Sequence, residues 1–194
     1  MPDIYTIGHS NQTLDEFLRL LTLHRLDVLV DVRSAPYSKY TSQFNSAPLK
    51  TSVTAAGLKY LYLGDELGGR PKGAAFYDAD GHVRYDRVAE SPFFLAGITR
   101  VESGIARYRV ALLCSEEDPT GCHRRLLVGR VLAGRGTAVW HIRGDGRLQP
   151  EGDLVAAEAA AAPQATLFAL EDVTPWRSIR SVLPKNGQPS SSDS

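Results

Sequence analysis

The chain has 194 residues, of which 43% are hydrophobic and 23% are charged, and its formal net charge is zero. This length predicts one domain and a tail. The neutral charge argues against a dedicated DNA-binding protein, and two cysteines are too few for a disulfide scaffold in a chain this long.

The first residues lack the basic and apolar regions of a signal peptide. No apolar run approaches the roughly 18 residues of a membrane span. We therefore expect a cytoplasmic protein with no membrane contact, in which Cys114 and Cys122 are both reduced thiols.

Predicted strands alternate with predicted helices along the chain. The strands are expected at residues 4–7, 27–32, 59–63, 109–113 and 137–142, where short apolar or β-branched runs occur. Helices are expected after the capping box at Thr13–Glu16, over residues 46–57, from Pro92 to about residue 106, and up to Gly134. This alternation predicts an α/β fold: a single-domain, three-layer sandwich with a mainly parallel sheet.

The remaining segments are expected to be loops and a tail. Residues 33–45 and 65–81 are polar or rich in glycine and have no clear period. We place the domain at residues 1–148 and an Ala/Ser-rich, partly disordered tail at residues 149–194, with disorder expected for the last ten residues. Within the tail, one short segment could dock through its apolar side chains: Trp176, Ile179, Val182 and Leu183.

Polar residues follow three of the predicted strands. Gly8-His9-Ser10 follows the first strand, Asp31-Val32-Arg33 ends the second, and Cys114 ends the strand at 109–113. Ligands of parallel sheets collect at the carboxyl ends of the strands. We therefore expect these segments to form one site.

The stretch from Cys114 to Arg124 has the strongest chemical pattern. A helix is expected to begin near Cys122-His123-Arg124, where backbone amides and arginines would favour a thiolate. Cys114 is the predicted nucleophile, Glu116 a general acid or base, and His9 or His123 a carrier of protons. A buried core thiol explains Cys114 about equally well. Cys122 could be a resolving thiol, a metal ligand or a residue that packs inward.

Further residues are expected to bind the ligand. Leu67-Gly68-Gly69-Arg70 resembles a turn that grips an anion, although paired glycines are common in ordinary loops. Asp31 and Arg33 could orient a ligand or form a structural ion pair, and Ser10 could simply end its strand. The predicted ligand-binding residues are Ser10, Asp31, Arg33, Ser38, Gly68, Gly69, Arg70, Cys122 and Arg124.

Four motifs occur in a specific order: TIGHS, DVRSAPYS, LGGR and LLCSEEDPTGCHRRLL. Together they resemble the bacterial domain-of-unknown-function family 488, over about residues 3 to 145. The resemblance implies a compact α/β fold and the same polar residues as the site, and it implies no activity. A weaker similarity to rhodanese-like domains rests on the Asp-x-Arg after a strand and the cysteine loop. Here that loop is longer, and the compact C-x₄-R pattern is absent.

Three functions are compatible with these residues. The first is a cysteine-dependent enzyme that acts on an anionic small molecule or nucleotide, without a cofactor or metal. The second is a protein that binds nucleic acid or nucleotides through the six arginines between residues 124 and 147, where Asp145 is the only acid. The third is a non-catalytic metal- or ligand-binding module. Its zinc version would use Cys114, Cys122 and His123 at an unusual spacing.

Overall fold

One six-stranded sheet contains all the strands that the sequence predicts. The computed structural model describes residues 1–161 and 176–182. The strands lie in the order β3-β2-β4-β1-β5-β6, and all neighbours are parallel except the antiparallel pair β5–β6. The strands are β1 (Asp3–Gly8), β2 (Val28–Asp31), β3 (Lys59–Tyr62), β4 (Val110–Cys114), β5 (Ala138–Ile142) and β6 (Leu148–Pro150). The predicted single-domain α/β fold is confirmed.

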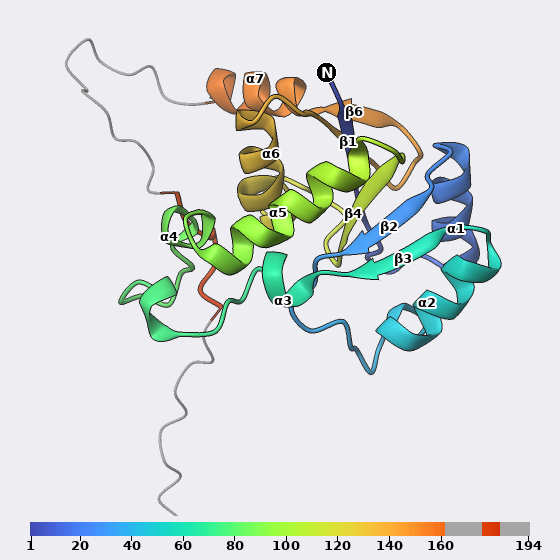
Figure 1. Cartoon of the computed structure of the whole chain (residues 1–194), viewed down its shortest axis with the longest axis horizontal. Coiled ribbons are helices and arrows are strands. Elements are labelled where there is room, and N and C mark those ends of the chain that lie inside the picture. The colour runs from blue at the N-terminus through green and yellow to red at the C-terminus, as the bar shows by residue number, and fades with distance from the viewer. Residues whose placement is uncertain (162–175, 183–194) are drawn as a thin grey trace, which may run out of the picture.

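Helices cover both faces of the sheet and form three layers with it (Figure 1). Successive side chains of a strand point to opposite faces. In β4, Val110 and Leu112 therefore pack in one hydrophobic cluster, and Ala111 and Leu113 pack in the other. The longer helices are α1 (Leu14–Leu23), α2 (Ser46–Ala55), α5 (Pro92–Ile105) and α7 (Glu151–Ala161). The shorter ones are α3 (Gly64–Leu67), α4 (Tyr85–Ala89) and α6 (Arg130–Gly134).

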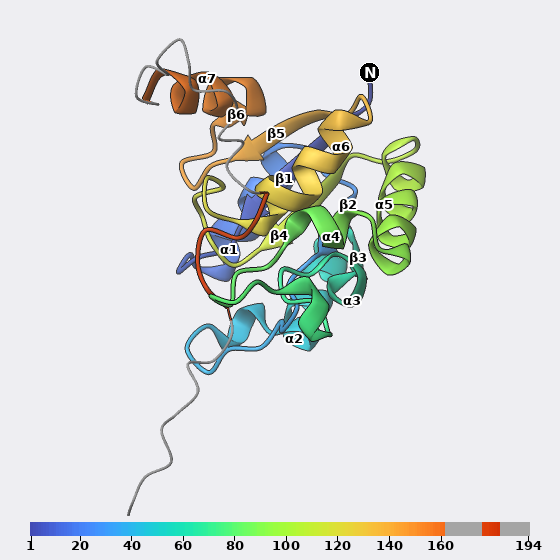
Figure 2. The ribbon, with the colours of Figure 1, turned by 90° about the vertical axis from the view of Figure 1, so that its left-hand side faces the viewer.

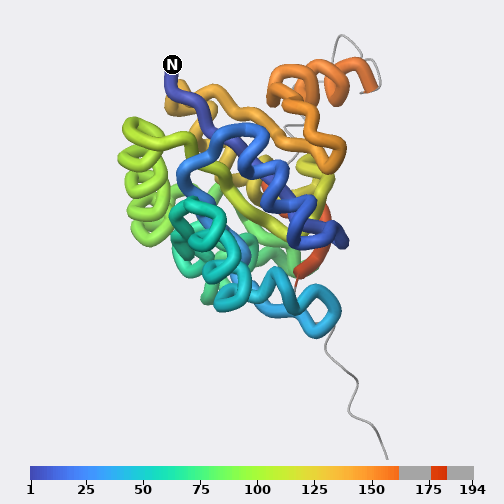
Figure 3. The backbone as a smooth tube through the Cα atoms, turned by 90° about the vertical axis from the view of Figure 1, so that its right-hand side faces the viewer, coloured from blue at the N-terminus to red at the C-terminus, as the bar shows by residue number. Residues whose placement is uncertain are grey.

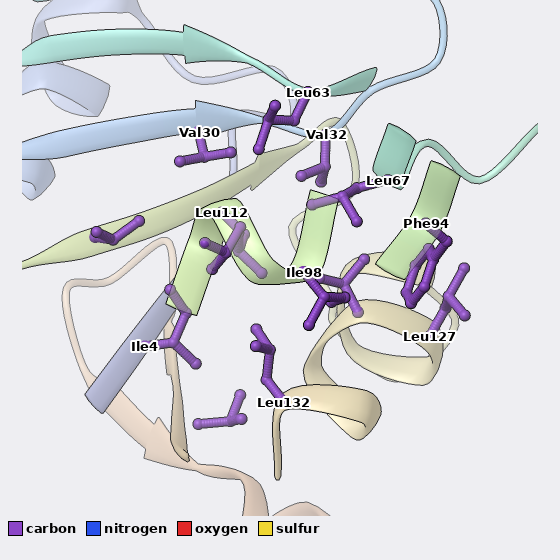
Figure 4. Close-up of a cluster of buried hydrophobic side chains, with 14 of the residues drawn as sticks. Ile4, Val30, Val32, Leu63, Leu67, Phe94, Ile98, Leu112, Leu127 and Leu132 are labelled. Carbon is purple, nitrogen blue, oxygen red and sulfur yellow. The ribbon is translucent and has the colours of Figure 1, made fainter. Parts of the chain in front are cut away.

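The first cluster joins the sheet to α5 and α6. Ile4 and Leu112 from the sheet are buried against Phe94 and Ile98 of α5 and Leu132 of α6 (Figure 4). Each such side chain contributes about 1.5–3 kcal/mol when it is removed from water. The second cluster packs α1 and α2 against the opposite face.

The start of α1 has the predicted capping box. The Thr13 hydroxyl accepts a hydrogen bond from the Glu16 amide at 3.2 Å, and the Glu16 carboxylate accepts one from the Thr13 amide at 3.1 Å. This pairing satisfies two amides that a helix start leaves unpaired. The capping box fixes the point where the chain turns from β1 into α1. This turn lies at the carboxyl ends of the strands, where the predicted site is found.

Several segments differ from the sequence expectation. The predicted loops contain short helices: η1 (Ser42–Phe44), α3 and η2 (Ala74–Phe76). The predicted helix that ends at Gly134 begins with a π-helical segment, η3 (Arg124–Gly129), before α6. These elements are too short to give a hydrophobic period, so tertiary contacts decide their conformation.

The boundary expected at residue 148 falls inside β6. This strand pairs with β5, and α7 follows it directly, so the domain extends beyond the expected limit. Alanine-rich α7 has little apolar surface, and Glu151 holds it in place instead, through an ion pair with buried Arg125 and a 2.7 Å contact with buried His141. Figure 3 shows α7 (orange) and α2 (cyan) at opposite ends of the molecule. This agrees with the sheet order, in which β6, which precedes α7, and β3, which follows α2, are the two outermost strands.

Residues 176–182 dock on the domain as a short segment, which we call the C-terminal strap. The Trp176 indole donates to the Leu126 carbonyl at 2.5 Å, and Ser178 and Val83 exchange two hydrogen bonds of 2.9 Å. Figure 2 shows the strap, in red, running beside the green chain that precedes α4. Leu183 and the last ten residues lie outside the described residues. No described helix is both long and apolar enough to cross a membrane.

Candidate functional site

The three polar strand ends meet at one edge of the sheet, as the sequence predicts. β4 lies between β1 and β2, and Gly8 of β1 is in register with Cys114 of β4. Asp31 of β2 is in register with Leu113, one residue earlier. A Cβ atom on Gly8 would overlap the carbonyl oxygen of Glu116. Glycine at this position therefore lets the loop after β4 fold back over β1.

A pocket of about 710 Å³ opens at this edge. Seven of the predicted site residues line it: Arg33, Gly69, Arg70, Cys114, Glu116, Cys122 and His123. The pocket therefore joins the cysteine loop to the second strand end and to the LGGR turn. Six other predicted residues do not line it: His9, Ser10, Asp31, Ser38, Gly68 and Arg124.

Both thiols lie beside one carboxylate and one imidazole. The Cys114 thiol donates to Glu116 Oε2 at 3.0 Å, and the Cys122 sulfur lies 3.2 Å from the same oxygen. The distances from the two sulfurs to His123 Nδ1 are 3.7 and 3.9 Å. Cys114 and Cys122 are only 4% and 2% exposed, so the pocket is their route to solvent.

The orientation of His123 is set by the end of β2. Its Nε2 lies 2.9 Å from the carbonyl oxygen of Val32, which can only accept a hydrogen bond. Nε2 therefore carries a proton, and Nδ1 is turned toward the thiols. A Cβ atom on Gly69 would lie 2.8 Å from His123 Cγ, so the glycine turn makes room for this ring.

The two cysteines have opposite pKa shifts. Hydrogen bonding with Cys122 and burial raise the pKa of the Cys114 thiol well above its ordinary value. Burial opposes ionisation of Cys122, but hydrogen bonds from Cys114 and His123 outweigh it and lower the pKa of Cys122 to about 5. Burial lowers the pKa of His123, yet its contact with Cys122 raises it above the ordinary value. The electrostatics thus favour a Cys122 thiolate beside a His123 imidazolium.

Glu116 remains a carboxylate in this cluster. Burial is the largest single effect and would raise the pKa of Glu116, but the hydrogen bond from the Cys114 thiol, further hydrogen bonds and the charge of His123 together outweigh it and lower the pKa to about 2. The predicted role as a general acid would need a protonated carboxyl group near neutral pH. Glu116 therefore fits a proton acceptor better than a proton donor.

Arg33 is held by groups inside the fold. Its Nε and Nη2 donate to the two carboxylate oxygens of Asp31, at 2.8 and 2.6 Å. The Tyr60 hydroxyl donates to Asp31 Oδ2 at 2.6 Å, and Arg33 Nη1 lies 3.1 Å from His9 Nε2. Asp31 and Arg33 therefore form a buried ion pair, of which only Arg33 reaches the pocket.

His9 lies behind Arg33 and away from the pocket. Its ring stacks on Phe44 with the ring centres 4.3 Å apart, and its Nδ1 is 2.9 Å from the Ser10 carbonyl. Burial is the main cause that lowers the pKa of His9. This geometry suits a neutral ring that orients Arg33, and it does not place His9 beside the thiols as a proton carrier.

Arg124 lies inside the fold and does not line the pocket. It is fully buried, and its guanidinium group donates to the Glu116 carbonyl oxygen and, at 2.6 Å, to that of Glu117. A third hydrogen bond, of 3.3 Å, reaches the Thr6 hydroxyl. Arg124 therefore fixes the loop that bears Glu116. Because its N–H donors are taken up by these internal acceptors, its guanidinium group does not face a ligand.

The other predicted binding residues outside the pocket shape the loops around it. The Ser10 amide donates to the Ser115 carbonyl at 2.8 Å, and the Ser38 hydroxyl accepts from the Tyr40 amide at 3.1 Å. A Cβ atom on Gly68 would overlap the Ser34 hydroxyl oxygen. That oxygen accepts a hydrogen bond of 2.9 Å from the Arg70 amide. Gly68 and Ser34 thereby fix the start of Arg70 at the pocket rim.

Sequence reasoning found no specific signal for Tyr85 and did not place the C-terminal strap at the site. Tyr85 lines the pocket from the start of α4, and Ser178 to Val182 form part of its wall. The spacing of Trp176, Ile179 and Val182 predicted that this segment docks, but nothing in the sequence indicated where. The position of the strap at the pocket depends on backbone hydrogen bonds from Ser178 and Val182 to the carbonyls of Val83 and Gly81, which are distant in the sequence.

Among the residues that the structure describes, two groups of side chains could hold a metal ion. One ligand atom from each of Cys114, Cys122 and His123 lies within 4.8 Å of the other two, which suits a small, soft cation such as Zn²⁺. Asp78, Asp80 and His82 form a second group. In that group, Asp78 already binds the Arg177 guanidinium at 2.8 Å.

The six arginines between residues 124 and 147 all have partners within the fold, and four of them pair with acids. The sequence places one acid nearby, whereas the fold brings acids from other elements, because Glu102, Glu151 and Glu158 approach from α5 and α7. The contacts are Arg124 with loop carbonyls, Arg125 with Glu151 and Glu158, Arg130 with the Trp176 ring, Arg135 with Glu102, Arg143 with Glu117, and Arg147 with Asp145. Three of the six arginines thus have acidic partners that the local sequence does not show, and binding of nucleic acid through this segment stays a prediction.

Comparisons with known proteins agree with the motif pattern. The family model described as "Domain of unknown function DUF488" matches residues 13–131. No curated protein and no solved structure matches the chain. The weaker similarity to rhodanese-like domains is not shown by these comparisons. Because the family model covers more than half of the sequence and contains the thiols, His123 and Arg70, the chain belongs to the DUF488 family of domains of unknown function.

Proposed function

We propose that this protein is a cysteine-dependent enzyme that acts on an anionic small molecule or nucleotide in a reducing, cytoplasmic environment. The observation that carries the proposal is the thiol pair at the pocket, with His123 Nδ1 turned toward both sulfurs. A thiol next to an oriented base is the arrangement that activates a nucleophile. Arginines at the same pocket favour a negatively charged substrate.

Cys122 is the better nucleophile, although the sequence favoured Cys114. The amides of Arg125 and Leu126 donate to the Cys122 carbonyl, so Cys122 lies at the start of the helical segment. Helix-start amides and a nearby imidazolium stabilise a thiolate there. Glu116 lies beside both sulfurs and does not distinguish them; Cys114 lies at the end of a strand, where hydrogen bonding with Cys122 and burial favour its protonated form. Cys114 therefore serves as a hydrogen-bond donor within the cluster.

The proposed reaction has two steps. First, Cys122 Sγ attacks an electrophilic carbon or phosphorus atom, and the leaving group departs with the electrons of the broken bond and takes the proton from His123 Nδ1. Next, water gives a proton to Nδ1 while its hydroxide displaces Sγ. The product is released, and the thiolate and imidazolium are restored.

Iodoacetamide labelling followed by peptide mass analysis tests this proposal. In the native protein at neutral pH, we expect labelling of one cysteine, Cys122, at a rate at least about tenfold above that of the same cysteine in the unfolded chain, because its thiolate fraction is higher. Cys114→Ser should keep the fast reaction. Cys122→Ser should lose it.

Two results would argue against the proposal. Slow labelling of both cysteines at equal rates would show that no thiol is activated. About one equivalent of zinc in protein purified without an affinity tag, together with thiols that react only after chelation, would instead indicate the metal-binding function.

A further inference from the structure

The wall of the pocket includes a segment from outside the family match. Residues 13–131 match the family model, whereas the C-terminal strap covers residues 176–182. Ser178 to Val182 line the pocket together with both thiols. This segment contains Arg180, so the pocket has an arginine that the family match does not include.

Two other arginines of the predicted site, Arg33 and Arg124, are bound within the fold. Arg33 gives its Nε and Nη2 donors to Asp31, and its Nη1 faces His9. Arg124 gives its donors to loop carbonyls and to Thr6. A bidentate grip on a ligand would require either guanidinium group to break these buried hydrogen bonds, which is costly.

Arg70 and Arg180 have a different environment. Among the described residues, neither side chain has a carboxylate partner, and both border the pocket. Their backbones are anchored: the Arg70 amide donates to Ser34 Oγ at 2.9 Å, and the Arg180 carbonyl accepts from Ser178 Oγ at 2.8 Å. The Val182 amide also donates to the Gly81 carbonyl at 3.0 Å. Two anchored backbone segments thus place Arg70 and Arg180 at the border of one cavity, with no carboxylate partner for either side chain in the described part of the chain.

We propose that Arg180 and Arg70 together bind a doubly charged anion, and that the substrate of the proposed enzyme carries a phosphate monoester. Paired guanidinium groups match the several oxygens and the charge of such a group better than those of a single carboxylate. This assignment rests on the proposed function for the chemistry that follows binding. The binding itself needs no reactive thiol.

Two acids, Glu116 and Asp118, also line the pocket, and their negative charge would repel an anionic ligand. Glu116 is turned toward the thiols, with Oε2 at 3.0 and 3.2 Å from the sulfurs. Asp118 forms an ion pair of 3.7 Å with Arg143. Both carboxylates therefore have partners other than the ligand. Arg143 offsets Asp118, whereas no described ion pair offsets Glu116, so Arg70 and Arg180 together exceed the remaining acid by one positive charge.

Binding of inorganic phosphate to the full chain at low ionic strength, measured by calorimetry, tests the assignment, with acetate as a singly charged comparison. Arg180→Met and Arg70→Met should each weaken phosphate binding by about tenfold to a hundredfold, the effect expected for losing a charge-assisted hydrogen bond. Arg147→Met is the matched control, because Arg147 is 69% exposed and pairs with Asp145 away from the pocket. This control should bind phosphate like the unmodified protein.

A second variant tests the strap without removing a charge. Ser178→Ala deletes the hydroxyl that bonds the Val83 amide and the Arg180 carbonyl. It should weaken phosphate binding in the same direction as Arg180→Met, and Ser178→Thr should restore most of the affinity. Trp176 fluorescence reports whether the strap stays docked in each variant.

The outcomes separate this inference from the proposed function. Phosphate binding that depends on both arginines supports the inference even if no thiol proves reactive. Absence of phosphate binding, equal binding of acetate and phosphate, or an unchanged affinity in Arg180→Met overturns it even if Cys122 labels rapidly.

Discussion

At the scale of single residues, the ionisation of Cys122 depends on neighbours from distant parts of the chain. His123 faces the sulfurs because Val32, at the end of β2, holds its other ring nitrogen. Gly69 leaves room for the ring. The sequence showed residue types suited to thiol chemistry, but it could not show which cysteine would lie nearer to positive charge.

The pH profile of alkylation tests this account. The reaction follows the thiolate fraction, and the pKa of Cys122 is lowered from 9.0 to about 5, so the rate should fall only as the pH drops through about 5. In His123→Ala, the loss of the imidazolium should move the midpoint toward the ordinary thiol value. His82→Ala serves as a control that leaves the cluster intact. A midpoint near the ordinary value in the unmodified protein would contradict the assignment.

The same scale shows why some predicted residues lie outside the pocket. His9, Asp31 and Arg124 were predicted from their positions at strand ends and at a helix start, and all three lie at that edge of the sheet. Their donors and acceptors are occupied by Arg33, Tyr60 and loop carbonyls. Proximity in the fold could be predicted from topology, whereas the choice between a ligand and an internal partner depends on side-chain geometry.

At the scale of elements, the loop that follows Cys114 passes closely over the end of β1, and this close approach sets the position of Glu116. Gly8 ends β1 where the loop passes, and any side chain there would collide with the Glu116 carbonyl. Gly8→Ala must displace this loop or the strand end. We expect it to lower the free energy of unfolding by about 2 kcal/mol or more, as for other overpacked sites, and to slow Cys122 labelling.

Gly134→Ala is the matched control for the Gly8 variant. Nothing lies within 4 Å of a Cβ atom at Gly134, so its unfolding free energy should change by less than about 1 kcal/mol. Urea unfolding of both variants gives the comparison. Equal stability of the two would show that the loop does not pass as closely as the structure indicates.

Elements with a clear hydrophobic period could be predicted from the sequence, and those without one could not. The five strands and the helix after Thr13 follow their patterns. The short helices α3 and α4 bury two residues each, and the π-helical segment η3 is almost wholly buried, so their conformation follows from what packs against them. The pocket borders two of these segments, through Tyr85 of α4 and through His123 just before η3.

At the scale of the whole molecule, a chain of buried polar groups joins the sheet to α7. The Thr6 hydroxyl lies 2.8 Å from His141 Nδ1, and His141 Nε2 lies 2.7 Å from Glu151. Glu151 also binds Arg125 of η3 at 2.9 Å. These contacts show why the domain extends past residue 148: Glu151 is the acidic partner of two buried basic side chains that belong to earlier elements.

Removing Glu151 should therefore destabilise the whole domain. Glu151→Ala leaves Arg125 and His141 buried with fewer partners, and breaking a buried ion pair on one side costs about 3–5 kcal/mol. Glu158 also binds Arg125, at 2.5 Å, but it is 53% exposed, so Glu158→Ala should cost about 1 kcal/mol or less. Urea unfolding measures both variants. Similar small losses would mean that α7 adds little to the fold and that the domain does end near residue 148.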